Sequence, residues 1–203
     1  MSQTYIKRIL NARVYDVARE TPLDVAPLLS SRLGNQAFLK REDLQPVFSF
    51  KCRGAYNKMS RLNTAARQAG VVAASAGNHA QGVALAAQTL GIKAKIVIPV
   101  TTPAIKVDAV RARGATVVLH GDSFDEAAVR AQTFVKQEGM TFIHPFDDPD
   151  VIAGQGTVAM ELVRQAPTPL DYVFICCGGG GLLAGMAAYL RYIWPQTRII
   201  GVE

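Results

Sequence analysis

The chain has 203 residues, of which 49% are hydrophobic and 19% are charged, and its net charge is +6. This composition excludes a disordered chain, which combines low hydrophobicity with high charge, and no apolar run reaches the roughly 18 residues that a membrane helix needs. The positive charge is concentrated in residues 51–113, which carry ten basic side chains and one acidic side chain. Such a segment suits an anionic ligand or nucleic acid, but scattered basic residues usually form solvated helix faces. We therefore expect no nucleic-acid partner.

Short apolar runs rich in β-branched residues alternate with stretches of helical periodicity. In chain order, the pattern predicts strand 71–74, helix 79–90, strand 94–98, helix 103–113, strand 116–119, helix 124–138, strand 141–143, helix 151–165 with interruptions at Gly154 and Gly156, strand 172–176, helix 181–192 and strand 198–202. Strands separated by helices pair in parallel through right-handed crossovers. The expected fold class is therefore α/β, with parallel twisted sheets covered by helices on both faces.

Local signals mark the starts of two predicted helices. Thr102 is placed to cap a helix that has Pro103 in its first turn, and Ser123 forms a capping box with Glu126. Ligands of parallel α/β sheets bind at the carboxyl ends of the strands. The loops that lead from strands into helices are therefore the places where a site is expected.

The two ends of the chain and its cysteines bear on two questions: whether the chain is a fragment, and which cellular compartment it occupies. Glu203 closes a strand with no helix behind it, which favours a fragment of a longer polypeptide; the alternative is that this strand simply ends a compact domain. Residues 1–10 lack the apolar core of a signal peptide. The three cysteines include no CxxC pair, and their spacing to histidine fits no zinc site. A reducing, cytoplasmic compartment is expected, with all three cysteines structural: Cys52, Cys176 and Cys177, the last two at the end of a buried strand.

The first candidate loop is rich in glycine and follows strand 172–176. Without Cβ atoms its backbone approaches an anion closely, and its N–H groups, together with the helix N-terminus, form a phosphate cradle. The loop lacks the Lys-Ser or Lys-Thr pair of a P-loop, which argues against a triphosphate with Mg²⁺. A plain flexible turn is the alternative, and phosphate binding is the preferred interpretation. The loop comprises Gly178, Gly179, Gly180 and Gly181, and Leu182 follows it.

The second candidate loop, residues 75–79, joins strand 71–74 to the next predicted helix. Ser75, Asn78 and the free N–H groups of this loop are suited to grip a carboxylate. A cluster of cap residues beside a hydrogen-bonded His79 explains the same pattern. The sequence pattern leaves these two interpretations open.

The third candidate is Lys51, which lies between Phe50 and a predicted helix start. A lysine in apolar surroundings has a depressed pKa and can act as a nucleophile or form an imine. Most lysines are solvated, so this residue alone indicates little. An amine, a phosphate cradle and a carboxylate loop together are the parts that a pyridoxal phosphate enzyme needs.

The three loops also match one known family in order and spacing. From about Ala12 to Glu203, the chain resembles the threonine dehydratases (threonine ammonia-lyases) of the biosynthetic type, in the tryptophan-synthase-β-like class of pyridoxal phosphate enzymes. The matching stretches are Lys40 to Lys51, Ser75 to Gly82 and Gly178 to Leu182, with weaker matches at Lys106 to Val110 and His144 to Asp147. At Cys176 and Cys177 the family more usually has apolar residues or proline.

This resemblance implies a fold of the type II pyridoxal phosphate enzymes with an incomplete large domain. Residues 1–54 and 150–203 would form part of the large cofactor-binding domain, and residues 55–149 the small α/β domain. The implied reaction is the deamination of L-threonine, by β-elimination of water, to 2-oxobutanoate and ammonia, the first step of isoleucine biosynthesis. Family members are commonly tetramers, so the resemblance also implies a homo-oligomer, with no membrane partner. The alternatives are an L-serine dehydratase, a serine racemase of the same family, or an inactive fragment.

The resemblance also implies a role for each matching residue. Lys51 would carry pyridoxal 5'-phosphate as an internal aldimine and serve as the catalytic base. Phe50 would pack beside the cofactor ring, and Asn78 would hydrogen-bond its phenolic oxygen. The phosphate would be held by Gly178, Gly179, Gly180, Gly181 and Leu182. The substrate carboxylate would be bound by Ser75, Ala76, Gly77, Asn78 and His79. Arg53 and His79 receive no catalytic role.

Overall fold

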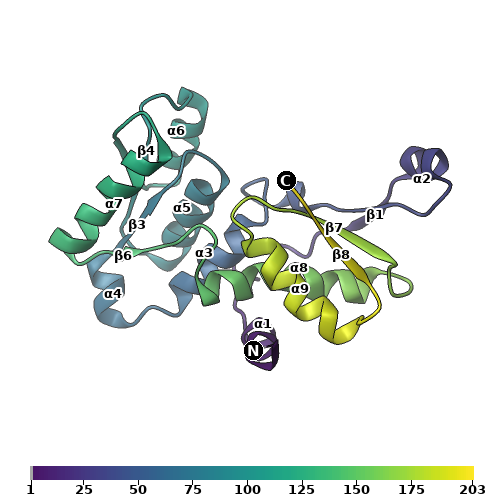
Figure 1. Ribbon diagram of the computed structural model, residues 1–203. Helices are drawn as coiled ribbons and strands as arrows, with labels where there is room; N and C mark the ends of the chain where they lie inside the picture. The colour runs from purple at the N-terminus through teal and green to yellow at the C-terminus, as the bar shows by residue number, and fades with distance from the viewer. Residues whose placement is uncertain (1) are drawn as a thin grey trace.

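The computed structural model describes residues 2–203, in which two parallel sheets are flanked by helices (Figure 1). A four-stranded parallel sheet occupies the middle of the chain, in the order β5-β4-β3-β6. Its strands are β3 Val71–Ala74, β4 Ala94–Ile98, β5 Thr116–Leu119 and β6 Thr141–Phe142. The predictions for these strands are confirmed, with β6 one residue shorter than expected.

Helices cover both faces of the four-stranded sheet, because side chains alternate between the faces of a strand. Val71 and Ile96 belong to a core shared with α3, α5 and α6, whereas Val72 and Val97 belong to a core shared with α7. These helices are α3 Lys51–Ser60, α5 Asn78–Leu90, α6 Ala104–Arg111 and α7 Phe124–Glu138. The expected covering of both faces is confirmed for this sheet.

The second parallel sheet has two strands and packs on two long helices. β7 Tyr172–Cys176 pairs with β8 Arg198–Val202, and the helices are α8 Pro149–Gln165 and α9 Gly181–Ile193. Val173 and Ile175 are buried against these helices, but Phe174, which points to the other face, is 68% exposed. The prediction that strand 172–176 is buried is therefore wrong for one face, because helices in the described part of the chain cover only the opposite face.

The N-terminal elements have no counterpart among the predictions. They are α1 Ser2–Leu10, β1 Leu23–Val25, α2 Pro27–Leu33, β2 Phe38–Lys40 and the short 3₁₀ helix η1 Glu42–Leu44, with α4 Thr64–Ala69 further along. β1 and β2 form an antiparallel pair, with Leu23 opposite Lys40, and Figure 1 shows α2 at the far right, beyond both parallel sheets. Strands of three residues are too short for an alternating pattern to stand out.

Two helix starts differ from the predictions in detail. α6 begins at Ala104, and Pro103, rather than Thr102, is its N-cap. Ser123 does cap α7, since its Oγ accepts a hydrogen bond from the Glu126 N–H at 3.2 Å. The reciprocal half of the capping box is absent within residues 2–203, because the Glu126 carboxylate accepts from the Asp122 N–H instead, at 2.6 Å.

The sequence pattern suggested that Gly154 and Gly156 interrupt α8, and this prediction is wrong. α8 is continuous, and a Cβ on Gly154 would lie 2.6 Å from the Gly54 Cα of α3. Gly54 and Gly154 therefore let the backbones of α3 and α8 come into contact, one turn after the start of α3. No helix within residues 2–203 has the length and hydropathy needed to cross a membrane.

Candidate active site

Lys51 begins α3, at a point where three parts of the chain meet. Its Nζ donates a hydrogen bond to the Pro145 carbonyl at 2.6 Å and lies 5.5 Å from the centre of the Phe50 ring. On the other side, a Cβ on Gly82 of α5 would lie 3.0 Å from the Lys51 carbonyl carbon. The glycine at position 82 therefore lets α5 pack directly on the start of α3.

The surroundings of Lys51 favour its neutral form. Burial lowers the pKa of the Lys51 amine, and the nearby Cys176 thiol opposes this shift only in part. A lysine with a lowered pKa has more free amine at neutral pH, and the free amine is the form that attacks a carbonyl group or accepts a proton.

The glycine-rich loop connects β7 to α9 and approaches Lys51 through Phe146. Gly180, with φ +83°, is the N-cap of α9. A Cβ on Gly179 would lie 2.1 Å from the Phe146 ring, and one on Gly181 would lie 2.9 Å from the Phe146 carbonyl oxygen. Because Phe146 follows Pro145, whose carbonyl binds Lys51, the segment joins the loop to the amine.

Part of the loop faces open space, which is what an anion needs in order to reach the backbone. A Cβ on Gly178 or on Gly180 would meet no atom within 4 Å. The first N–H groups of a helix have no acceptor inside the helix, and here they lie at the start of α9. These residues fit a phosphate group.

The loop formed by residues 75–79 leads from β3 into α5. The Ser75 Oγ accepts a hydrogen bond from the Gly77 N–H at 3.2 Å, and Gly77 is the N-cap of α5. Asn78 is exposed at the first position of the helix. Within residues 2–203 no hydrogen bond joins Asn78 to Lys51, whose amine donates to Pro145 instead.

His79 is buried and anchors the same segment that holds Lys51. Its Nε2 lies 2.8 Å from the Ile143 carbonyl oxygen, and since a carbonyl only accepts, Nε2 carries the proton. Its Nδ1 has no hydrogen-bond partner among the described residues. Ala76, in the same loop as His79, packs on the core that contains Val71 and Ile96. The alternative of a hydrogen-bonded core histidine therefore describes the Nε2 side of His79 but not the Nδ1 side.

The pH dependence of folding provides a test of this burial. Burial lowers the pKa of His79 from 6.5 to about 3, so the stability that neutral His79 contributes is complete above pH 6.5 and declines as the pH falls toward 3. Between pH 6.5 and pH 5 we expect His79 to account for a loss of about 2 kcal/mol in the free energy of unfolding. Urea denaturation at both pH values should show this loss in the wild type and in His120→Gln, which changes an exposed histidine, but not in His79→Gln. An equal loss in His79→Gln would contradict the assignment.

The cysteines do not behave alike. Cys52 is buried, and burial raises the pKa of its thiol to about 12. Cys176 is exposed and Cys177 is half-buried, so the expectation that both lie in a buried strand end is wrong, because the second sheet has one open face. No group of three or more His, Cys, Asp or Glu side chains within residues 2–203 is placed to hold a metal ion.

Two contacts at this site were missed from the sequence. The Pro145 carbonyl is a backbone acceptor, which no residue type announces, and Phe146 packs on Gly179 from a loop after β6. The only sequence signal was the matching stretch from His144 to Asp147. Its His144 Nδ1 accepts hydrogen bonds from the Phe146 and Asp147 N–H groups, at 3.2 and 2.8 Å, and so shapes this turn.

A parallel α/β fold with an amine beside a glycine-rich loop defines a class of proteins suited to hold a phosphorylated ligand next to a nucleophile. Comparison with known proteins agrees with this class. A family model described as pyridoxal-phosphate dependent enzyme matches residues 14–203. The chain belongs to this family of pyridoxal-phosphate dependent enzymes.

Individual relatives are similar over nearly the whole chain. A chloroplastic biosynthetic threonine dehydratase of Arabidopsis thaliana is 59% identical over 98% of this chain and 34% of the relative. A biosynthetic L-threonine dehydratase of Burkholderia multivorans is 56% identical over 100% of this chain and 40% of the relative. The chain thus spans about a third to two-fifths of the length of these curated relatives. The resemblance to biosynthetic threonine dehydratases is confirmed.

Solved structures confirm the fold. The processed form of threonine deaminase isoform 2 from Solanum lycopersicum superposes with a TM-score of 0.96, at 55% identity, over 100% of this chain and 59% of that one. Maize serine racemase superposes with a TM-score of 0.94, at 36% identity, over 98% of this chain and 60% of that one. The expected α/β architecture of type II pyridoxal phosphate enzymes is therefore correct.

Proposed function

We propose that this chain carries the amine, the phosphate cradle and the carboxylate loop of a pyridoxal 5'-phosphate-dependent dehydratase. The proposed reaction eliminates water from L-threonine, and water then hydrolyses the resulting imine to give 2-oxobutanoate and ammonia. The observation that carries the proposal is the meeting of the Lys51 amine with the glycine-rich loop across Pro145 and Phe146. The names of the relatives that are 59% and 56% identical support threonine as the substrate.

The residues present fit this cofactor, and each has a proposed task. When bound, pyridoxal phosphate supplies an electron sink for charge at the substrate α-carbon. Residues 178–182 would bind the phosphate through backbone N–H groups, and Phe50 would pack beside the ring. Asn78 would orient the ring through a hydrogen bond. Lys51, with its lowered pKa, would accept the α-proton at Nζ.

Residues 75–79 would bind the substrate carboxylate, from Ser75 through Ala76, Gly77 and Asn78 to His79. The N-terminus of α5 favours a negative charge at this point. Neutral His79 leaves an unpaired Nδ1 acceptor, so the attraction for the carboxylate would come from backbone N–H groups and hydroxyl donors, not from an imidazolium charge.

The division of the chain and its surroundings belong to the same proposal. Residues 55–149 contain the whole four-stranded sheet, which supports their assignment as the small domain, with 1–54 and 150–203 in the large domain. We also propose a homo-oligomer, as in the family. The proposed compartment is the cytoplasm, although some relatives are named as chloroplastic or mitochondrial.

A second candidate is a serine dehydratase or a serine racemase. The superposition on maize serine racemase, at 36% identity, favours keeping this alternative. Parallel assays with L-threonine and L-serine, with chiral analysis of the remaining serine, separate the candidates. A cofactor-loaded chain that turns over neither amino acid would instead indicate the inactive-fragment alternative.

The decisive experiment is the visible absorption of the protein with pyridoxal phosphate, before and after L-threonine is added. We expect a band that shifts with threonine in the wild type and is lost in Lys51→Ala. Lys106→Ala, which removes an exposed lysine, is the control for cofactor bound to surface amines and should retain the band. A band in Lys51→Ala that responds to threonine as in the wild type would refute the role of Lys51.

A further inference from the structure

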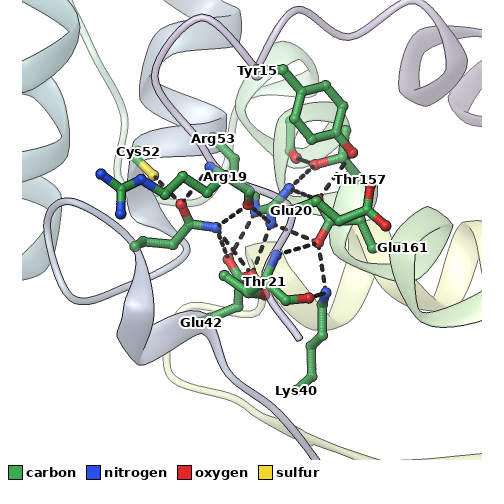
Figure 2. A network of polar contacts seen from close by, with 12 residues as sticks. Tyr15, Arg19, Glu20, Thr21, Lys40, Glu42, Cys52, Arg53, Thr157 and Glu161 are labelled. Atoms are coloured by element: carbon green, nitrogen blue, oxygen red, sulfur yellow. Dashed lines mark hydrogen bonds and ion pairs between the residues drawn. The ribbon is translucent and has the colours of Figure 1, made fainter. Parts of the chain in front are cut away.

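A buried ion network lies behind the first turn of α3, and Arg53 is at its centre (Figure 2). The Arg53 guanidinium makes paired hydrogen bonds to the Glu42 carboxylate, both at 2.8 Å. It makes a second pair to the Glu161 carboxylate, at 2.6 and 3.0 Å. Paired contacts between arginine and carboxylate fix the orientation of both groups as well as their distance.

The network is balanced in charge and largely closed to solvent. Lys40 Nζ donates to Glu161 at 2.6 Å, so two positive and two negative side chains face one another. The Arg53 and Glu161 side chains are both 0% exposed. Hydroxyl groups complete the shell, with Tyr15 donating to Glu161 and Thr21 to Glu42, at 2.9 and 2.6 Å.

The network joins three elements around the residue that the proposed function depends on. Glu42 lies on η1, Glu161 on α8, and Arg53 two residues after Lys51 on α3. Two residues of an α-helix are about 200° apart around the axis, so Arg53 and Lys51 project from opposite sides of the same turn. The network therefore holds the first turn of α3 from the side opposite to the Lys51 amine.

The start of α3 lacks the usual local support. Phe50 is its N-cap residue and makes no side-chain capping hydrogen bond. Capping normally fixes the first turn of a helix, and α3 has instead the ion pairs of Arg53 and the close contact between Gly54 and Gly154. A buried ion pair is weak evidence of net stabilisation, so a role in geometry is the more informative interpretation.

We propose that Arg53 is a positioning residue, which sets the place of the Lys51 amine by clamping the first turn of α3 between Glu42 and Glu161. This inference deepens the proposed function and depends on it only for the use made of the amine. The position of Lys51 can be measured without any cofactor. The positioning role can therefore be refuted while the proposed function holds, and the proposed function can be refuted while the positioning role holds.

The test compares Arg53→Lys with Arg41→Lys in the cofactor-free protein. Lysine keeps the charge but cannot bridge two carboxylates in pairs. Arg41 is the matched control, because it also binds two carboxylates, Asp24 and Asp43, but these three side chains are 34%, 44% and 59% exposed. The readout is the pH at which Lys51 becomes half-reactive toward acetic anhydride, measured by peptide mass spectrometry, with folding checked by near-ultraviolet circular dichroism.

We expect Lys51 in the wild type and in Arg41→Lys to react at a lower pH than exposed lysines do, because burial lowers its pKa. The titratable neighbours of Lys51, which are Cys176 and the buried His79, are the same residues in all of these proteins. In Arg53→Lys the half-reaction pH should rise toward that of the exposed lysines, with the circular dichroism retained. A folded Arg53→Lys protein in which Lys51 reacts as in the wild type would overturn the proposal.

A second variant keeps the test decisive if Arg53→Lys does not fold. Glu42→Gln removes one negative charge and weakens one of the paired contacts of Arg53. Loss of a nearby negative charge would by itself lower the pKa of Lys51, whereas loosening of the turn into water would raise it. A rise in the half-reaction pH of Lys51 supports the positioning role, and a fall or no change contradicts it.

Discussion

Arg53→Met should lower the free energy of unfolding by about 3–5 kcal/mol, which is the usual cost of removing one partner of a buried ion pair. The guanidinium satisfies Glu42 and Glu161 together, and Glu161 has no exposure to water. Burial alone would raise the pKa of Glu161, but Arg53 and Lys40 together hold it below its ordinary value of 4.5. Without Arg53, Lys40 is the one positive side chain of the network that is left for the two carboxylates of Glu42 and Glu161, so one negative charge remains unpaired. Urea denaturation at pH 7, where the carboxylates are ionised, measures the loss.

Two further variants separate this mechanism from a general loss of packing. Arg53→Met/Glu161→Met also removes the carboxylate with no exposure to water and leaves Lys40 and Glu42, whose side chains are 11% and 12% exposed and so reach water. Replacement of a buried ion pair by apolar side chains of similar volume is often neutral. We therefore expect the double variant to recover much of the lost stability. Arg41→Met breaks exposed ion pairs and should cost less than about 1 kcal/mol. Equal losses in the single and double variants would show that an unpaired carboxylate is not the cause.

Gly154→Ala should destabilise the protein by about 1–3 kcal/mol through overpacking. A Cβ at position 154 would lie 2.6 Å from the Gly54 Cα and 2.7 Å from the Arg53 carbonyl oxygen. Both obstacles are backbone atoms of α3, so relief requires the two helices to move apart. The sign is diagnostic, since glycine to alanine inside a helix otherwise stabilises by roughly 0.5–1 kcal/mol.

The measurement for Gly154→Ala is again the urea unfolding curve, with Arg164→Ala as the comparison in the same helix. Arg164 forms an exposed ion pair with Glu20, so its loss should cost less than about 1 kcal/mol. An unchanged or raised stability in Gly154→Ala would mean that α3 and α8 are not in backbone contact.

The regular elements of the middle of the chain were predictable from sequence because their signals are local. β3 and β4 have the predicted bounds, and α7 ends at Glu138, before Gly139. The N-terminal third was not predictable in the same way. β1 and β2 have three residues each and are defined by pairing with each other, with Leu23 opposite Lys40.

The candidate site was predictable only in its parts. The glycine-rich loop, the loop beginning at Ser75 and the lysine at the start of α3 were recognisable as separate pieces of chemistry. The roles of Lys51 and Asn78 toward a cofactor stay predictions. Arg53 received no catalytic role, and the structure gives it a buried position that its spacing from Lys51 did not reveal.

By itself, the sequence determined the alternation of strands and helices and the residue types of the three loops, because side-chain periodicity, capping and glycine-rich turns act over a few neighbouring residues. Only the tertiary structure decided which of these groups meet. Lys51 reaches the Pro145 carbonyl across 94 positions of the chain, and Arg53 reaches Glu161 across 108. Contacts at such separations depend on how helices and sheets pack, and packing is set by the whole chain together.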